Sequence, residues 1–289
     1  MNERLVVIGG GTMGAGIGFV AAGAGFAVEL VEVDPDRAAG ARRALDERWD
    51  RTVERGRVTA EEAAEARSRL TVVTAVTDVA PGPDVIVEAV PERVELKRDV
   101  LRAAEKLAPA LLATNTSSIS IDELATTLDA PERFCGLHFF NPVWAMALLE
   151  VVIGQSTSDA TRAAAVRLAD RLGKQPVVVA DAPGFASSRL GVTLGLEAIR
   201  MVEDGVASPA DIDKAMTLGY RHPMGPLELT DVVGLDVRLD IARTLRAAYG
   251  DRFAPPALLE RMVAEGRLGR KSGQGFYRWV DGKKEEAGG

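Results

Sequence analysis

The feature that most constrains this 289-residue chain is a run of glycines near its start. Gly9, Gly11 and Gly14 form a G-x-G-x-x-G pattern directly after the apolar residues 5–8. Glycines in this pattern let the backbone turn sharply and approach a pyrophosphate, which then binds the free amides at the start of the following helix. The pattern therefore predicts a strand, a tight turn and a helix that bind a dinucleotide.

A carboxylate stands where a dinucleotide-binding fold needs one. Glu32 ends the next predicted strand, 18 residues after Gly14, and a carboxylate there can accept hydrogen bonds from the adenosine ribose. Glu32 and Asp34 would repel the 2′-phosphate of NADP, so NAD is the predicted cofactor, and Arg37 is the only nearby residue that argues for NADP. The alternative is a tight turn in a doubly wound sheet that binds nothing.

The rest of the chain predicts two domains. Runs of β-branched and aliphatic residues alternate with helical stretches up to about residue 180, which predicts a parallel sheet covered on both faces. The predicted strands are residues 5–8, 28–33, 71–73, 85–88, 111–114, 136–139, 149–153 and 177–180, and the main helices between them are 36–55, 92–107 and 159–172. Thr59 with Glu62, and Ser120 with Glu123, are typical of capped helix starts.

After residue 180 every long segment has a helical period. The candidate helices are residues 187–203, 209–217, 227–247 and 256–265. The sequence therefore predicts an α/β fold in which a Rossmann-like doubly wound sheet (residues 1–182) is followed by an all-α domain (residues 183–289).

Composition excludes several classes of protein. The formal net charge of −7 argues against a nucleic-acid partner, because no overall positive field exists to replace counterions on phosphate. The single cysteine, Cys135, excludes an internal disulfide and is typical of the cytoplasm. Two histidines and one cysteine are too few for an imidazole- or thiolate-rich metal site. Glycines break up the uncharged residues 5–28, so we expect a soluble, cytoplasmic protein without a membrane span.

One histidine has a candidate partner. His138 lies among aromatic residues in a predicted strand, where a histidine is usually a core residue, and that interpretation stays open. Glu150 lies in the apolar residues 148–152, where a carboxylate is costly to bury unless it is paired. A His–Glu pair fixes the imidazole tautomer. Hydride transfer from an alcohol to a nicotinamide needs such a group to take the hydroxyl proton.

Two polar positions follow other predicted strands. Glu88 ends the strand at residues 85–88, where doubly wound sheets place ligand-facing residues. An ordinary solvated strand end explains it equally well. Ser117 and Ser118 follow the strand at 111–114, and the alternative for them is a plain turn.

The ordered motifs resemble those of the short-chain (S)-3-hydroxyacyl-CoA dehydrogenase family, and within it the bacterial 3-hydroxybutyryl-CoA branch. The resemblance extends along essentially the whole chain. The matching segments are residues 7–17, 115–118, 136–142, 183–185, 211–216, 222–229 and 269–277.

The resemblance implies an enzyme that reversibly oxidises an (S)-3-hydroxyacyl-CoA with NAD, and a homodimer formed through the helical domain. His138 then corresponds to the catalytic acid/base, Glu150 to the carboxylate that orients it, and Ser117 to a serine that contacts substrate and cofactor. Arg55 stands where a basic residue touches the CoA portion. The positions at which the family binds NAD are Gly9, Gly11, Gly14, Glu32, Glu88, Lys97, Asn141 and Lys271.

The predicted CoA contact has a local context. Arg48, Arg51 and Arg55 stand three and four residues apart on a predicted helix and so share one side. The alternative is an exposed helix face, because Glu47 and Glu54 are nearby.

One position departs from the family pattern. Ser188 stands where the family has an asparagine in the catalytic site, and its hydroxyl can bind the thioester carbonyl through a water. Loss of such a donor costs about 10²–10³ in rate, so the exchange bears on efficiency and acyl preference. One alternative is a dehydrogenase for another 3-hydroxy acid or an acyl-carrier-protein thioester. The other is a non-catalytic NAD-binding structural protein, against which the retained Ser117, His138 and Glu150 argue.

Overall fold

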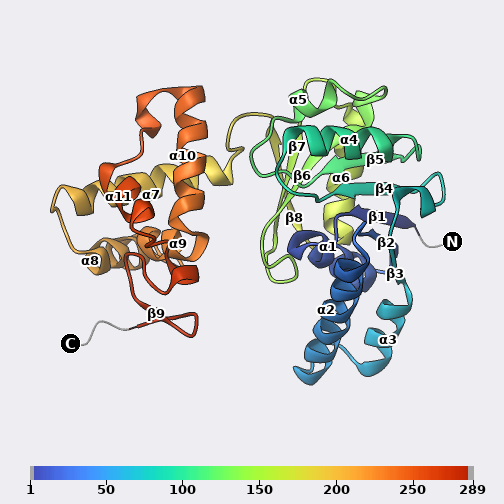
Figure 1. The fold of residues 1–289 in the computed structure, drawn as a ribbon, viewed down its shortest axis with the longest axis horizontal. Coiled ribbons are helices and arrows are strands. Elements are labelled where there is room, and N and C mark those ends of the chain that lie inside the picture. The colour runs from blue at the N-terminus through green and yellow to red at the C-terminus, as the bar shows by residue number, and fades with distance from the viewer. Residues whose placement is uncertain (1–2, 286–289) are drawn as a thin grey trace. The chain divides into compact units, whose positions relative to one another are not determined.

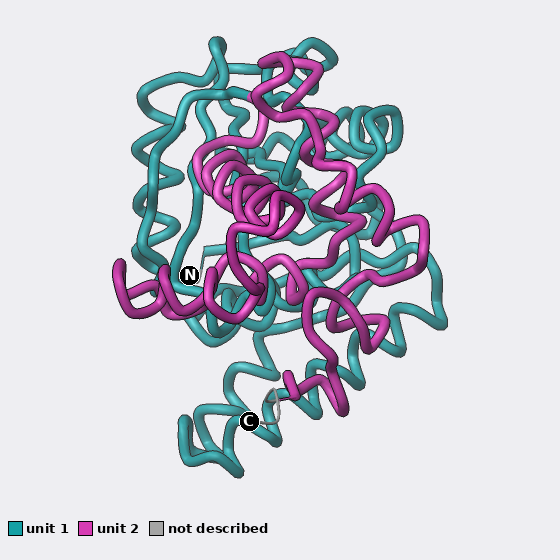
Figure 2. Tube along the Cα trace, turned by 90° about the vertical axis from the view of Figure 1, so that its left-hand side faces the viewer, with its two compact units in different colours: residues 1–182 teal, residues 183–289 magenta. Residues whose placement is uncertain are grey.

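The computed structural model describes residues 3–285 and divides into two compact units, each with its own hydrophobic core. Unit 1 is Met1–Ala182 and unit 2 is Pro183–Gly289, coloured separately in Figure 2. The outermost residues of both predicted domains, 1–2 and 286–289, lie outside the described residues. Within residues 3–285, every helix is too short or too polar to cross a membrane.

Unit 1 is built on an eight-stranded sheet in the order β3-β2-β1-β4-β5-β6-β7-β8 (Figure 1). Its strands are β1 (Arg4–Ile8), β2 (Ala27–Val31), β3 (Leu70–Val73), β4 (Val85–Glu88), β5 (Leu111–Thr114), β6 (Phe134–Phe139), β7 (Leu148–Ile153) and β8 (Gln175–Ala180). Strands β4, β5 and β6 are buried along their whole length, as strands covered on both faces must be. The predicted Rossmann-like fold is confirmed.

Helices connect the strands of unit 1. They are α1 (Thr12–Gly23), α2 (Pro35–Glu54), α3 (Ala60–Ser68), α4 (Val94–Glu105), α5 (Ile121–Ala125) and α6 (Asp159–Arg171). The predicted capping box is present, since Thr59 accepts a hydrogen bond from the Glu62 amide and Glu62 from the Thr59 amide. The Ser120 hydroxyl likewise caps α5 by accepting from the Glu123 amide.

The predicted parallel sheet is confirmed from β1 to β6, and its last two strands depart from it. β7 pairs with β6 antiparallel, and β8 pairs with β7 parallel. The connection between β6 and β7 spans only residues 140–147, and a parallel crossover needs a dozen residues or more. The chain therefore turns back directly, which sets residues of β7 opposite residues of β6.

Unit 2 is mainly helical. Its helices are α7 (Ser187–Glu203), α8 (Pro209–Lys214), α9 (Pro226–Val233), α10 (Leu235–Tyr249) and α11 (Ala257–Ala264), with a π-helical turn at Ala215–Gly219. The single helix predicted over 227–247 is wrong, because Gly234 adopts a φ of +106° that ends α9 before α10 begins. The all-α prediction also misses the short antiparallel pair β9 (Trp279–Val280) and β10 (Lys283–Lys284).

Candidate active site

The glycine turn leaves room in front of a helix N-terminus. Gly9 has a φ of +113°, and a Cβ on Gly14 would lie 1.8 Å from the Gly9 carbonyl oxygen, so the packing of α1 against the turn requires both glycines. Gly11 precedes α1 without a side-chain cap, and a Cβ there would meet no protein atom within 4 Å. Its lack of a side chain instead keeps the uncapped amides of α1 accessible, which suits a pyrophosphate.

Glu32 lies beside this turn at the end of β2. Its Oε2 accepts a hydrogen bond from the Gly10 amide at 3.0 Å, and its Oε1 accepts from the Asp34 amide at 3.3 Å. Asp34 itself caps α2 by accepting from the Arg37 amide. The half-buried Glu32 carboxylate is thus held at the position where a dinucleotide places its ribose. The turn and this carboxylate together fit NAD.

Glu88 and Lys97 form a buried ion pair. Lys97 Nζ lies 2.8 Å from Glu88 Oε1 and also donates to the Val90 carbonyl, and the two side chains are 1% and 0% exposed. Glu88 accepts further hydrogen bonds from the Thr114 hydroxyl (2.6 Å) and the Val90 amide (2.6 Å). These contacts account for both side chains without a ligand. Their predicted contact with NAD stays a prediction.

Glu92 organises the serine turn after β5, and the sequence analysis missed it. Its Oε1 accepts from the Thr116 hydroxyl (2.6 Å) and from the amides of Ser117 (2.9 Å) and Ser118 (3.1 Å). Burial opposes ionisation of Glu92, but Lys97 and these hydrogen bonds outweigh it and lower its pKa. Its place just beyond the carboxyl end of β4 was the available signal. The exposed Ser117 is therefore held by a charged acceptor.

His138 and Glu150 face each other across β6 and β7. The antiparallel register pairs the two residues directly, and His138 Nδ1 lies 2.7 Å from Glu150 Oε2. Both are buried, at 6% and 1% exposure. Asn115, the residue after β5, also contacts β6, because its Oδ1 accepts a hydrogen bond from the Phe139 amide at 2.9 Å. The structure thus brings the predicted imidazole and carboxylate together at the same end of the sheet as the serine turn.

A buried lysine stabilises the connection between β6 and β7. Lys174, which is buried, donates from Nζ to the carbonyls of Val143 and Met146. Burial lowers the pKa of Lys174. The predicted cofactor residue Asn141 is exposed in this same connection, directly before a cis proline peptide.

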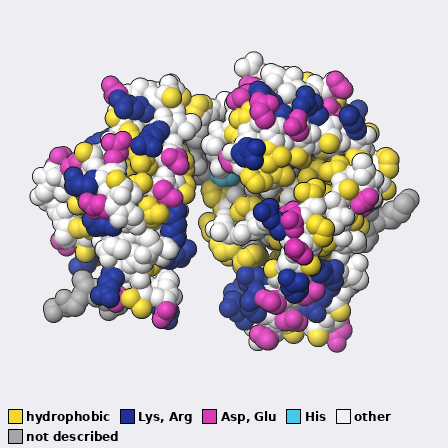
Figure 3. All heavy atoms as spheres, viewed as in Figure 1, with side chains coloured by type: hydrophobic (Ala, Val, Ile, Leu, Met, Phe, Trp, Pro, Cys, Tyr) yellow, Lys and Arg dark blue, Asp and Glu magenta, His cyan; other side chains and the backbone are white. Residues whose placement is uncertain are grey.

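The predicted basic face lies on α2. The Arg48 guanidinium stacks over the Trp144 ring at 3.6 Å, and burial, with the charges of Arg51 and Arg55, lowers the pKa of Arg48. Arg51 also lies 3.7 Å from Glu47. Figure 3 shows Lys and Arg crowded, with acidic neighbours, over the part of unit 1 that α2 and α3 form. The mutual repulsion of three guanidinium groups suits an anion.

Two predicted site residues belong to unit 2. Ser188 lies half-buried in the first turn of α7. Lys271 lies in the short turn Arg270–Ser272 and pairs with Asp236 at 2.5 Å. Their predicted contacts with substrate and NAD stay predictions.

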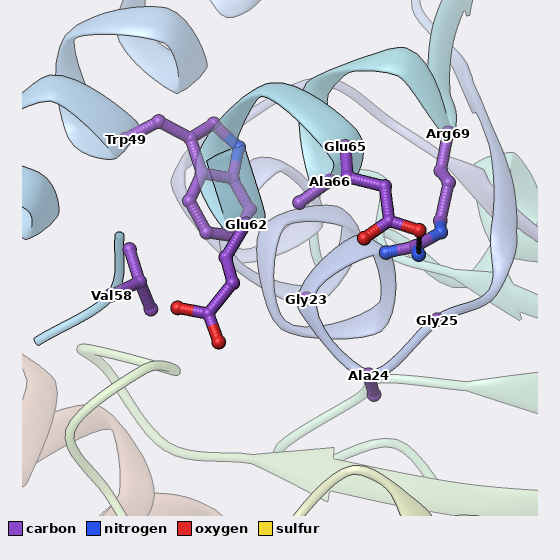
Figure 4. Close-up of a pocket in the computed structure, with 9 residues that line it drawn as sticks. All are labelled: Gly23, Ala24, Gly25, Trp49, Val58, Glu62, Glu65, Ala66 and Arg69. Carbon is purple, nitrogen blue, oxygen red and sulfur yellow. Dashed lines mark hydrogen bonds and ion pairs between the residues drawn. The ribbon is translucent and has the colours of Figure 1, made fainter. Parts of the chain in front are cut away.

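A pocket of about 340 Å³ lies elsewhere in unit 1, where α2 and α3 meet the C-terminal end of α1 (Figure 4). Its lining includes Trp49 and the ion pair between Glu65 and Arg69. The glycine turn is at the other end of α1, and a helix of 12 residues is about 18 Å long. This pocket contains none of the predicted site residues and is not part of the candidate site.

Comparison with known proteins places the whole chain in one family. Residues 4–182 match the family model of the 3-hydroxyacyl-CoA dehydrogenase NAD-binding domain, and residues 184–279 match that of its C-terminal domain. The probable 3-hydroxybutyryl-CoA dehydrogenase of Bacillus subtilis is 39% identical over 282 residues, which cover 96% of this chain and 98% of that protein. The 3-hydroxybutyryl-CoA dehydrogenase of Bradyrhizobium diazoefficiens is 40% identical over 284 residues, which cover 97% of each.

A solved structure agrees with these sequence matches. The crystal structure of (S)-3-hydroxybutyryl-CoA dehydrogenase from Ralstonia eutropha has a TM-score of 0.92 at 36% identity and covers 97% of this chain and 100% of that chain. The matches confirm the predicted resemblance, the oxidoreductase class and the NAD cofactor. The chain belongs to the 3-hydroxyacyl-CoA dehydrogenase family.

Proposed function

We propose that this protein oxidises the 3-hydroxyl of an (S)-3-hydroxyacyl-CoA to a 3-oxoacyl-CoA with NAD, reversibly, and that His138 transfers the proton. The observation that carries the proposal is the 2.7 Å contact between His138 Nδ1 and Glu150 Oε2 inside an apolar sheet. A carboxylate buried at such cost serves a purpose that an apolar residue cannot serve. Orientation of a catalytic imidazole is such a purpose.

The pair assigns each imidazole nitrogen a task. An ionised Glu150 accepts only, so the proton on the line between them belongs to His138 Nδ1. Nε2 then carries the lone pair that removes the hydroxyl proton of the substrate. Glu150 stabilises the imidazolium that forms, and in the reverse direction Nε2 returns the proton to the oxygen. NAD, when bound, supplies the hydride acceptor.

The other predicted residues bind and position. We assign Gly11 and the start of α1 to the pyrophosphate of NAD, Glu32 to its ribose, and Ser117 to the substrate oxygen. Asn141, Lys271 and Ser188 keep the NAD and thioester contacts that the resemblance implies. Glu88 and Lys97 act from inside the fold, because their hydrogen bonds hold the backbone after β4.

The CoA portion belongs on the basic face of α2 in this proposal. Arg48 and Arg55 there can neutralise phosphates, with Arg48 held in place by Trp144.

We further propose a homodimer formed through unit 2, which the exposed Leu190, Val233 and Val237 support. The free, buried Cys135 supports the reducing environment of a cytoplasm.

Consumption of NADH with three acceptors tests the function. Acetoacetyl-CoA should be reduced, while free acetoacetate and the acetoacetyl-acyl-carrier-protein thioester should be reduced far more slowly. Preference for the carrier-protein thioester would transfer the assignment to that substrate, an alternative that Ser188 favours. Binding of NADH without turnover of any acceptor would support the non-catalytic alternative.

A further inference from the structure

Unit 2 contains a buried arginine in a position that the helix period reserves for the core. Arg238 shares the buried stripe of α10 with Leu235, Leu239 and Ala242, and it is only 5% exposed. Within residues 3–285, its guanidinium makes neither a hydrogen bond nor an ion pair, and its Nε is fully buried without a partner. Burial lowers the pKa of Arg238 to about 10, so the group is still a cation at neutral pH.

Such a cation destabilises a fold unless something binds it. A buried charge is normally paired, because desolvation costs several kcal/mol for each ion. The acids nearest to it in sequence do not pair with it. Asp236 pairs with Lys271 through Oδ2 while its own Oδ1 has no partner in the described part of the chain, and Asp240 lies on the exposed face of α10. The fold therefore keeps a largely buried guanidinium that has no acceptor among residues 3–285, and its Nε is the donor that is fully buried.

Two glycines of the neighbouring helix lie directly against this guanidinium. A Cβ on Gly191 of α7 would lie 3.3 Å from Arg238 Nη1, and a Cβ on Gly195 would lie 3.7 Å from its Cζ. The same Cβ on Gly195 would lie 3.2 Å from the Thr230 hydroxyl. Two glycines, one turn apart, thus allow the arginine to lie against α7 where larger side chains would exclude it.

The same face of α7 begins with a predicted substrate residue. Ser188, Gly191 and Gly195 are three and four residues apart and so share one side of the helix. At a rise of about 1.5 Å per residue, Gly191 and Gly195 lie about 4.5 and 10.5 Å along the axis from Ser188. The guanidinium therefore lies within a short acyl chain's length of the side chain expected at the thioester carbonyl.

We propose that Arg238 binds a carboxylate at the far end of the acyl chain, so that the preferred substrates are CoA thioesters of 3-hydroxydicarboxylic acids. This inference rests on the proposed function, since it takes Ser188 as a substrate contact. The planar guanidinium matches a carboxylate with two parallel hydrogen bonds.

A comparison of two thioesters tests the inference. The CoA thioesters of 3-hydroxyhexanedioic acid and 3-hydroxyhexanoic acid differ only in a terminal carboxylate or methyl group. The ratio of their kcat/KM values should exceed about 10 in the wild type, because a buried donor left unpaired discriminates strongly. Arg238→Met should lower that ratio by about 10- to 100-fold. Arg243→Met, on the exposed side of the same helix, should keep the wild-type ratio.

Further outcomes separate the alternatives. A wild-type ratio near one, or an unchanged ratio in Arg238→Met, overturns the inference, and so does a variant that becomes monomeric with its ratio intact. Gly195→Leu provides a second route if Arg238→Met does not fold, because the larger side chain would displace the guanidinium from α7 and should lower the ratio with the arginine present. Absence of turnover of every thioester, 3-hydroxybutyryl-CoA included, overturns the proposed function itself, and the inference with it.

Discussion

Two of the buried cations, Lys97 of unit 1 and Arg238 of unit 2, differ in how their charge is satisfied. Lys97 of unit 1 is 1% exposed and donates to Glu88 and to the Val90 carbonyl. Arg238 of unit 2 is 5% exposed and has no acceptor among residues 3–285. The difference teaches how to separate two uses of a buried charge. A buried ion whose hydrogen bonds are satisfied within the protein stabilises the fold, whereas a buried ion without an acceptor indicates a bound ligand.

The largest expected effect tests whether His138, a buried group already paired with Glu150, is also catalytic. His138→Asn removes the proton-transferring nitrogen and should lower kcat by about 10²–10⁴. NADH affinity should be retained, because His138 is not a predicted cofactor contact. Steady-state kinetics and NADH fluorescence titration measure the two quantities. The matched control is His222→Asn, the other histidine of the chain, which should turn over as the wild type does. Retained turnover in His138→Asn would remove this residue from the mechanism.

The next effect tests the comparison directly through stability. Lys97→Met leaves the Glu88 carboxylate buried without its counter-ion and should lower the free energy of unfolding by about 3–5 kcal/mol. Arg238→Met removes a charge that has no partner to strand, so it should leave that free energy unchanged or raise it. Urea unfolding of both variants measures the difference. An equal loss of unfolding free energy in the two variants would contradict the distinction between a buried cation with acceptors and one without.

Local patterns predicted most of the fold but not the features set by tertiary connections. The glycine turn and the alternation of strands and helices sufficed for the Rossmann-like sheet. The reversal of β7 depends on the short connection at residues 140–147, and strand periodicity carries no information on direction. Gly234 was visible inside the predicted helix 227–247, yet an isolated glycine breaks a helix only where its φ becomes positive. Strands of two residues are too short for any period.

The candidate site likewise contains residues that local sequence patterns predicted and residues that they did not. The pairing of His138 with Glu150 followed from sequence because a carboxylate in an apolar strand demands a partner. Glu92 was missed because it lies in a loop, where acceptors of several backbone amides leave no periodic signal. Arg238 was missed although an arginine within the apolar stripe of α10 was readable from spacing alone. Only the structure shows that Arg238 has no acceptor within residues 3–285.

A smaller effect concerns Glu92, an acid whose carboxylate accepts several hydrogen bonds. Glu92→Gln removes the charge that Lys97, Thr116, Ser117 and Ser118 stabilise and should lower kcat/KM by about 10-fold as the serine turn loosens. Because the folded pKa of Glu92 lies below its ordinary value of 4.5, its contribution to stability is present above that pH and is lost as pH falls through the folded pKa. The stability difference between wild type and variant should therefore shrink below pH 4.5. A difference independent of pH would contradict a role for the charge.

The smallest effect contrasts exposed cations with the enclosed one. Arg55→Gln should raise KM for a CoA thioester about two- to fivefold, because an exposed charge contributes at most about 1 kcal/mol. The corresponding pantetheine thioester, which lacks the nucleotide phosphates, should show no change, and neither should Arg43→Gln with the CoA thioester.

In about 0.5 M salt the Arg55→Gln effect should disappear, since the Debye length is then only a few ångströms. The loss of dicarboxylate preference in Arg238→Met should persist at that salt concentration, because ions in solution screen a buried pair far less. Equal salt sensitivity in the two variants would mean that the Arg238 guanidinium meets its acceptor in open solvent.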